Sequence, residues 1–157
     1  DALDGGCRLL AKIVSDLTDG KFDIQVFAAG EVVPALQVLD AVQNGTVEMG
    51  HSASYYYIGK NPALAFDTCL PFGLNARQQA AWMTHGGGAA LMQDLFASYN
   101  IRPFPAGNTS AQMAGWFRRE INTVDDFKGL KFRTGGLAGQ VLAKLGVVPQ
   151  QLGAADV

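Results

Sequence analysis

An arginine at the end of a strand pattern, followed by a glycine turn, is the combination in this sequence best suited to binding an anion. Residues 130–133 end in Arg133, and Gly135 and Gly136 precede a helical pattern. Free amide groups at a helix N-terminus bind anions, and a guanidinium grips a carboxylate through two parallel hydrogen bonds. The pattern indicates an anchor for a carboxylate or phosphate. The alternative is a surface arginine before an ordinary strand-to-helix turn.

Aromatic and amide side chains form two further candidate groups. The run Tyr55–Tyr57 follows the carboxyl end of a predicted strand, where open α/β sheets bind ligands. Asn108 and Gln112 flank a predicted strand start beyond a glycine loop. Their amides can read a carbonyl or hydroxyl group, or donate a carbonyl oxygen to a hard cation. Core packing explains at least one of the three tyrosines, and both amides also fit an ordinary polar surface.

Few residues could support catalysis. His51 and His85 are the only imidazoles, and Cys69 lies in a predicted loop without electropositive sequence neighbours. A reactive cysteine needs such neighbours or a nearby base, so we interpret Cys69 and Cys7 as small buried thiols. An enzyme that uses Cys69 or a histidine on the same scaffold stays open as the alternative function.

The glycines after Arg133 also invite comparison with a dinucleotide-binding loop. Gly135 and Gly136 are adjacent, which fits the G-x-G-x-x-G pattern poorly. A dinucleotide-dependent oxidoreductase is therefore a weaker form of the enzyme alternative.

Composition excludes several classes of protein. Of the 157 residues, 48% are hydrophobic and 17% are charged, which argues against an extended disordered tail. The net charge of −2 gives no electrostatic case for nucleic acid or an anionic membrane as partner. No apolar run approaches the ~20 residues of a membrane span. Two cysteines make no disulfide framework, although a single bridge stays open.

Helical and strand patterns alternate along the chain. Apolar residues at spacings of three and four, or helix start and stop signals, predict helices at residues 1–19, 34–43, 76–85, 88–99, 123–128 and 136–145. Alternating apolar residues or short apolar runs predict strands at residues 22–27, 47–52, 101–105, 112–117, 130–133 and 147–149. This order, with its short connections, favours an α/β fold with a parallel sheet flanked by helices. The run Gly86–Gly88 separates two of the helices and has no evident function.

Several segments taken together resemble the solute-binding proteins of TRAP transporters, the DctP-type family. They lie at residues 41–49, 57–62, 70–74, 107–121, 126–133 and 147–151. The segment 107–121 (GNTSAQMAGWFRREI) is the most telling, and 126–133 (DFKGLKFR) resembles the most general signature of the family. The resemblance covers essentially the whole chain, and the subgroup it is most similar to takes 2-oxo acids and related small carboxylates.

The resemblance implies a periplasmic receptor rather than an enzyme. Its expected fold is the bilobal, type II fold of periplasmic binding proteins, in which two α/β lobes close around a small carboxylate for delivery to a membrane permease. Arg133 falls at the position that binds the ligand carboxylate, beside the amides of Gly135 and Gly136. No organic cofactor is implied.

The same resemblance implies a cation. In the 2-oxo acid subgroup, a glutamine matching Gln112 helps hold a sodium or calcium ion that bridges to the ligand. Tyr57 and Asn108 resemble positions that line the pocket. Substrate-binding residues are thus expected at Arg133, Gln112, Asn108, Tyr57, Gly135 and Gly136.

The family pattern also predicts how the chain divides. Family members continue well past residue 157, so we expect an incomplete fold: residues 1–106 form most of the first lobe, and residues 107–157 begin the second. In the family, a long helix beyond that point sets the oligomer, which leaves a homodimer open. No nucleic-acid partner is expected.

Overall fold

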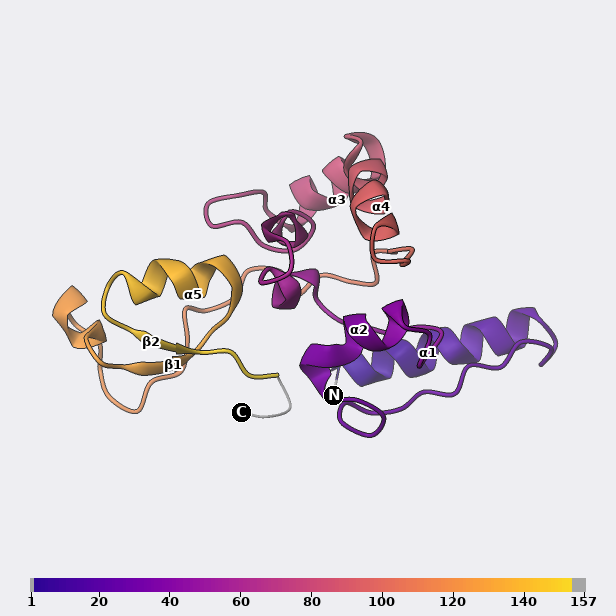
Figure 1. Ribbon diagram of the computed structural model, residues 1–157, viewed down its shortest axis with the longest axis horizontal. Coiled ribbons are helices and arrows are strands. Elements are labelled where there is room, and N and C mark those ends of the chain that lie inside the picture. The colour runs from indigo at the N-terminus through magenta and orange to yellow at the C-terminus, as the bar shows by residue number, and fades with distance from the viewer. Residues whose placement is uncertain (1, 154–157) are drawn as a thin grey trace.

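The structure, a computed structural model, describes residues 2–153. Its helices and strands, in chain order, are α1 (Ala2–Leu17), α2 (Val38–Gln43), α3 (Ala76–His85), α4 (Gly88–Ala97), β1 (Lys131–Arg133), α5 (Gly136–Ala143) and β2 (Val148–Gln150). Short 3₁₀ helices add η1 (Ala35–Gln37), η2 (Ser54–Tyr57), η3 (Pro62–Ala65) and η4 (Val124–Phe127). The strands and α5 lie at one end of an elongated molecule and α1 at the other (Figure 1).

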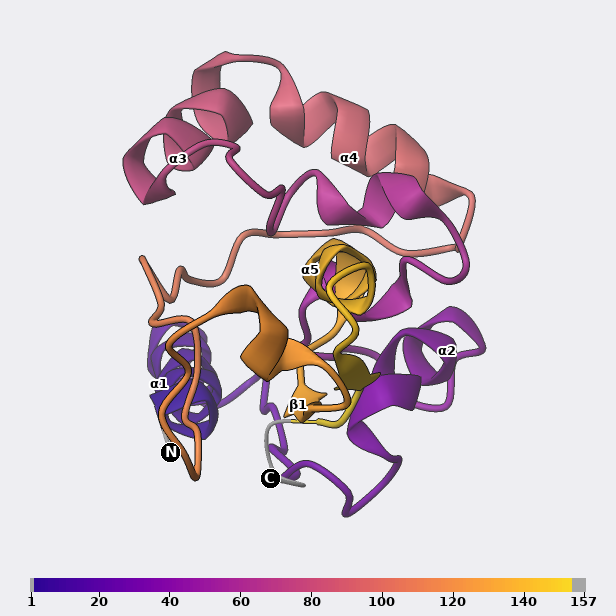
Figure 2. The same cartoon turned by 90° about the vertical axis from the view of Figure 1, so that its left-hand side faces the viewer.

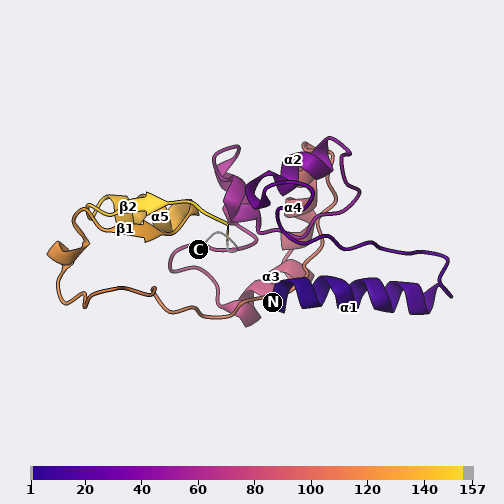
Figure 3. The same ribbon diagram turned by 90° about the horizontal axis from the view of Figure 1, so that it is seen from below.

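The first helix forms as its apolar spacing predicts. Asp4 lies in its first turn, where a carboxylate complements the helix dipole, and accepts a hydrogen bond of 2.8 Å from Arg8 Nε. Figure 3 shows that α1 lies parallel to the long axis of the molecule, in the half opposite the strands. Much of its apolar side, including Leu10 and Leu17, is exposed. None of the helices within residues 2–153 has the length and apolar character needed to cross a membrane.

The hydrophobic core lies where α2, η2, η3 and α4 meet. Its buried side chains are Leu39, Tyr57, Leu64, Met92 and Phe96. Leu64 has no exposed surface. The Tyr57 hydroxyl accepts a hydrogen bond of 3.2 Å from the Leu39 amide and lies 2.9 Å from Ser52 Oγ, so its polar atom is satisfied inside the core.

The three glycines between α3 and α4 have a packing role. Asn75 caps α3 through a reciprocal capping box with Gln78, and α4 begins at Gly88; both starts agree with the sequence prediction. Gly87 has a φ of +83°, a left-handed conformation that favours glycine. A Cβ on Gly88 would lie 2.6 Å from the Trp82 ring. The glycines thus let the chain turn between the helices and pack α4 closely against the Trp82 indole.

A βαβ unit follows in the last third of the chain. β1 and β2 pair in parallel, with Lys131 opposite Val148 and Arg133 opposite Gln150, and α5 connects them and packs on β2. Figure 2 shows α5 end-on over β1. Before β1, the Asp126 carboxylate accepts hydrogen bonds from the Asn122 and Thr123 amides, which caps η4 as predicted.

Four predicted strands do not pair within residues 2–153. They are the segments 22–27, 47–52, 101–105 and 112–117. Alternating apolar residues indicate that the two faces of an extended chain differ in polarity. A strand also needs a hydrogen-bonded neighbour, and within the described residues only β1 and β2 are paired. The last segment packs through side chains instead, since Phe117 stacks on Phe132 at a centroid distance of 5.2 Å. The expectation of a sheet built from the first hundred residues is therefore wrong for the part of the chain described.

Candidate functional site

Arg133 is placed by the βαβ unit. It is the last residue of β1, its backbone is in register with Gln150, and the Thr134 amide donates a hydrogen bond of 3.1 Å to the Gln150 carbonyl. The stacked ring of Phe132 fixes the preceding residue. The arginine therefore leaves the carboxyl edge of the sheet from a rigid element, where α/β proteins bind ligands.

The guanidinium of Arg133 is held by acceptors from two distant parts of the chain. Nε and Nη2 donate to the Leu152 carbonyl at 3.1 and 2.9 Å, and Nη2 also donates to the Tyr56 hydroxyl at 3.3 Å. Arg133 is half-buried. Within residues 2–153 the hydrogen bonds of the guanidinium involve only Nε and Nη2, so both N–H groups of Nη1 are available to a carboxylate.

The glycine turn lies between Arg133 and the tyrosine run. Gly136 has a φ of +63°, and a Cβ there would lie 3.1 Å from Tyr55 Cδ2, so any side chain would be both strained and crowded. Gly135 and Gly136 line an open groove of about 370 Å³ together with Ile58, Gly59 and Gln151. Because Gly135 and Gly136 have no side chains, the start of α5 can lie directly against η2.

The tyrosine run divides between the core and the site. Tyr57 points into the core, where its hydroxyl bonds Ser52 and Leu39, and not toward Arg133. Tyr56 contacts Arg133 instead. Its ring centroid lies 4.6 Å from that of Tyr55, and burial, followed by a hydrogen bond to Tyr56, raises the pKa of Tyr55. The Tyr55 phenol therefore stays protonated at neutral pH.

Asn108 and Gln112 hydrogen-bond within their own loop. Asn108 Oδ1 accepts from the Ser110 amide at 2.7 Å, and Gln112 Nε2 donates to Thr109 Oγ1 at 2.9 Å. Both side chains are exposed. The structure thus brings Gly135 and Gly136 to the neighbourhood of Arg133, and leaves Asn108 and Gln112 in contact with other residues.

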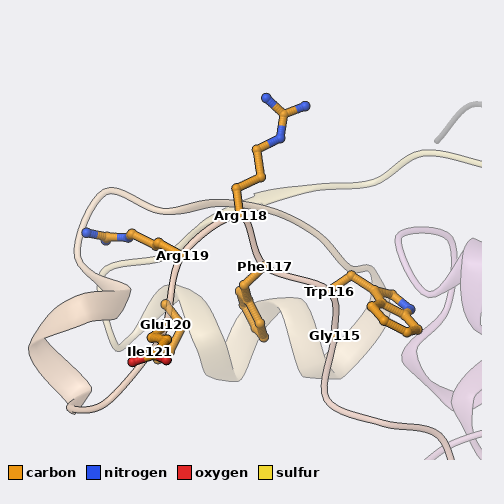
Figure 4. A pocket seen from close by; sticks show the side chains of 7 residues that line it. All are labelled: Gly115, Trp116, Phe117, Arg118, Arg119, Glu120 and Ile121. Atoms are coloured by element: carbon orange, nitrogen blue, oxygen red, sulfur yellow. The ribbon is translucent and has the colours of Figure 1, made fainter.

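A second groove, of about 590 Å³, follows the segment 115–121. Trp116 is 87% exposed, and Arg118 extends away from the βαβ unit on the side opposite Phe117 (Figure 4). Phe117 instead packs against Phe132. The groove is an open surface beside the extended segment and contains no group that also contacts Arg133.

The cysteines are free and poorly activated. Cys69 is exposed and Cys7 is partly exposed, so their predicted burial is wrong, and no bridge joins them. Cys7 Sγ lies 3.1 Å from His51 Nδ1, but burial and the nearby charge of Asp4 raise the pKa of the Cys7 thiol. Although Cys69 is exposed as a residue, partial desolvation of its thiol group also raises the pKa of Cys69. Neither thiol is the low-pKa thiolate that nucleophilic catalysis uses.

The sequence prediction missed Gln151 and Leu152, and it chose Tyr57 rather than Tyr56 from the tyrosine run. Gln151 Nε2 donates to the Tyr56 carbonyl at 2.9 Å, and Leu152 binds Arg133 through its main-chain carbonyl. The tyrosine run signalled that one aromatic lines the site, but the turn of η2 decides which one. The main-chain carbonyl of Leu152 could not be predicted as an acceptor, because every residue type has such a carbonyl.

The family model for bacterial extracellular solute-binding proteins, family 7, matches residues 2–157 of this chain. The chain is 59% identical over 152 residues to the monocarboxylate 2-oxoacid-binding periplasmic protein of Nostoc sp.. That match covers 97% of this chain and 42% of the relative, so the chain spans less than half the length of that protein.

Solved structures of TRAP transporter solute-binding proteins share the fold. One from Bordetella bronchiseptica, with copurified calcium and picolinate, has a TM-score of 0.92 and 53% identity over 96% of this chain and 45% of its own. One from Pseudoalteromonas atlantica, with bound sodium and pyruvate, has a TM-score of 0.91 and 47% identity over 97% of this chain and 46% of its own. The predicted fold class, part of a bilobal α/β binding protein, is confirmed.

Proposed function

The chain belongs to the bacterial extracellular solute-binding proteins of family 7, and we propose that it forms the carboxylate-anchoring part of a periplasmic TRAP receptor for a small 2-oxo acid. The receptor delivers its ligand to the membrane permease of the transporter and catalyses no reaction. The observation that carries the proposal is the orientation of Arg133, whose Nε–Nη2 edge is fixed by Leu152 and Tyr56 while Nη1 is available. A guanidinium held in this way loses little freedom when it binds a carboxylate.

The neighbouring groups complete the proposed anchor. Gly135 and Gly136 line the groove at the start of α5, where free amides and the helix dipole favour an anion. The Tyr56 hydroxyl lies 3.3 Å from Nη2, from which it accepts a hydrogen bond, and its O–H can donate to the same carboxylate. Tyr57 and Asn108, expected from the family pattern, support the proposal less, because the core holds one and a local turn holds the other.

A cation is the second element of the proposal. Gln112 Nε2 bonds Thr109, which leaves the hard amide oxygen Oε1 for a sodium or calcium ion. Residues 2–153 contain no group of three His, Cys, Asp or Glu side chains that could hold a metal by themselves. The cation would therefore take its other oxygens from the ligand and from groups beyond this set, and its charge would neutralise the oxo acid.

We further propose that residues 1–106 belong to one lobe and residues 107–157 to the other. Support comes from the main hydrophobic core, whose members all lie before residue 100, and from the βαβ unit, which lies wholly after residue 130. A homodimer through a more C-terminal region would be compatible with this division.

The test is Arg133→Ala in the complete protein, titrated with pyruvate by calorimetry. Removing one partner of a buried charge pair costs about 2–5 kcal/mol, so the dissociation constant should rise ~30-fold or more. Arg118→Ala is the matched control, since its exposed side chain extends away from the βαβ unit (Figure 4). An Arg133→Ala affinity within a few-fold of the parent would remove Arg133 from the site.

The dinucleotide alternative is separated by thermal shift. A ligand that binds the folded state raises the melting temperature in proportion to the logarithm of its concentration over its dissociation constant. We expect a rise with pyruvate and none with NAD or NADP. The reverse pattern would favour an oxidoreductase.

A further inference from the structure

The 3₁₀ helix η2, which lies in the segment before residue 106, contacts the segment after residue 130. Three contacts converge on two adjacent residues. Arg133 Nη2 donates to the Tyr56 hydroxyl at 3.3 Å, Gln151 Nε2 donates to the Tyr56 carbonyl at 2.9 Å, and Gly136 packs against the ring of Tyr55. The side chain and the main chain of Tyr56 are thus held by different residues of the other segment.

Gln151 makes the main-chain contact from a fixed position. A Cβ on Gly135 would lie 3.3 Å from Gln151 Cγ, so the stem of the glutamine lies directly on the glycine turn. Its amide then reaches across to Tyr56. Gln151 also follows Gln150, whose backbone is paired with Arg133. The glutamine therefore connects the turn beside Arg133 to the residue whose hydroxyl contacts Arg133.

We infer that Gln151 is a positioning residue that holds Tyr56, and with it the first segment, in the arrangement that completes the carboxylate site. This inference rests on the proposed function. Gln151 also lines the groove, but its amide nitrogen is engaged by the main-chain oxygen of Tyr56, so it acts through the placement of Tyr56 rather than on the ligand. Its loss would lower the fraction of molecules in the binding-competent arrangement.

This role has a distinctive signature. When only a fraction of molecules is competent, the apparent dissociation constant is the intrinsic one divided by that fraction, whatever the ligand. A positioning residue therefore weakens all ligands by one factor, whereas a residue that touches the ligand changes selectivity. Because the bond is solvent-exposed, we expect a roughly threefold to tenfold loss.

The experiment compares Gln151→Met and the parent in the complete protein, by calorimetry with pyruvate and with 2-oxobutanoate. Methionine keeps the length of the side chain but cannot donate to Tyr56. Gln150→Met is the matched control, because the Gln150 amide is exposed and bonds only the neighbouring Pro149 carbonyl. We expect both dissociation constants to rise by the same factor in Gln151→Met, with unchanged stoichiometry, and neither to change in Gln150→Met.

Three results would overturn the inference. They are unchanged affinities in Gln151→Met, factors for the two ligands that differ by more than about threefold, and an equal loss in Gln150→Met. Gln151→Ser is a second variant, which removes the amide without adding bulk beside Gly135. It guards against a disturbance of the turn by methionine, and it must show the same uniform loss. If the parent binds neither 2-oxo acid, the proposed function itself fails. If the parent binds and Gln151→Met is unchanged, only the role of Gln151 fails.

Discussion

The core around η2 and η3 and the βαβ unit of β1, α5 and β2 bury their apolar residues in different ways. The core gathers five buried side chains from elements spread over residues 39–96. The βαβ unit completes a parallel pair within 20 residues and holds it by main-chain hydrogen bonds, with Val147 as its buried hydrophobic side chain among the residues described. Side-chain packing dominates the first region and backbone pairing the second.

The candidate site lies at the junction of these two regions. Arg133 comes from the paired unit and Tyr56 from the edge of the packed core. The βαβ unit fixes Arg133 and the packed core fixes Tyr56. Within the part of the chain that the structure describes, the hydrogen bonds between the two regions are those that Arg133 and Gln151 donate to Tyr56. Such a junction can open without loss of either unit, which is what a receptor closing on its ligand needs.

The largest expected effect tests whether packing dominates the first region. Leu64→Ala removes a side chain with no exposed surface, and such changes cost about 2–5 kcal/mol of the free energy of unfolding. Val147→Ala in the second region deletes fewer atoms and should cost less, about 1–2 kcal/mol. Denaturant unfolding measures both. If Val147→Ala lost more unfolding free energy than Leu64→Ala, side-chain packing would not be the dominant contribution in the first region.

Glycine substitutions sharpen the contrast in packing. Gly88→Ala would place a Cβ 2.6 Å from the Trp82 ring, and overpacking of this kind costs about 1–3 kcal/mol. Gly139→Ala in α5 would place its Cβ 3.5 Å from Pro149, an ordinary contact, and should gain up to ~1 kcal/mol from helix propensity. Thermal unfolding distinguishes the two signs. Equal effects would mean that Trp82 moves to admit the methyl group.

The same two regions explain how much the sequence could predict. The bounds of α3 are set by Asn75 and Gly86, which act on their own helix, so local pattern was sufficient. β1 and β2 were predicted because both strands and the connecting helix lie close together in sequence. The segments 22–27 and 47–52 show the right alternation, but pairing depends on a neighbour that no local pattern reveals.

The candidate site was predicted to the same extent. The strand end and glycine turn indicated Arg133 and Gly136, which the structure places at the end of β1 and at the start of α5; their role in binding stays a prediction. The acceptors that orient Arg133 are 19 and 77 residues away in sequence, and one of them is a main-chain oxygen. Tyr57 and Tyr56 differ only in the direction that η2 gives their side chains. Contacts of this range follow from the fold and not from residue type.

The pH dependence of the free energy of unfolding should differ between the two regions, because their carboxylates have pKa values shifted in opposite directions. Burial raises the pKa of Asp67, whose carboxylate accepts a hydrogen bond from Ser54 Oγ beside the core. Stability from a raised pKa is present below the unfolded value near 3.8 and is lost as pH rises through the folded value. Asp67→Asn keeps an acceptor for Ser54 and cannot ionise, so it should gain stability relative to the parent between pH 4 and 7. The exposed Asp94→Asn is the control, and a constant difference across this range would contradict the prediction.

The βαβ region should respond to pH in the opposite direction and least strongly. The pKa of Asp126 is lowered, first by the Thr123 amide, then by the Asn122 amide and the Thr123 hydroxyl, which all donate to its carboxylate. Stability from a lowered pKa is present above the unfolded value and is lost as pH falls through the folded one. The advantage of the parent over Asp126→Asn should therefore shrink below pH 4, while Asp125→Asn, which loses only an exposed pair with Lys128, stays parallel to the parent. Chemical denaturation between pH 2.5 and 6 measures this difference. Because the pKa of Asp67 is raised by burial and that of Asp126 is lowered by hydrogen bonds, slopes of opposite sign in the two variants would show that the regions differ in electrostatics as they do in packing.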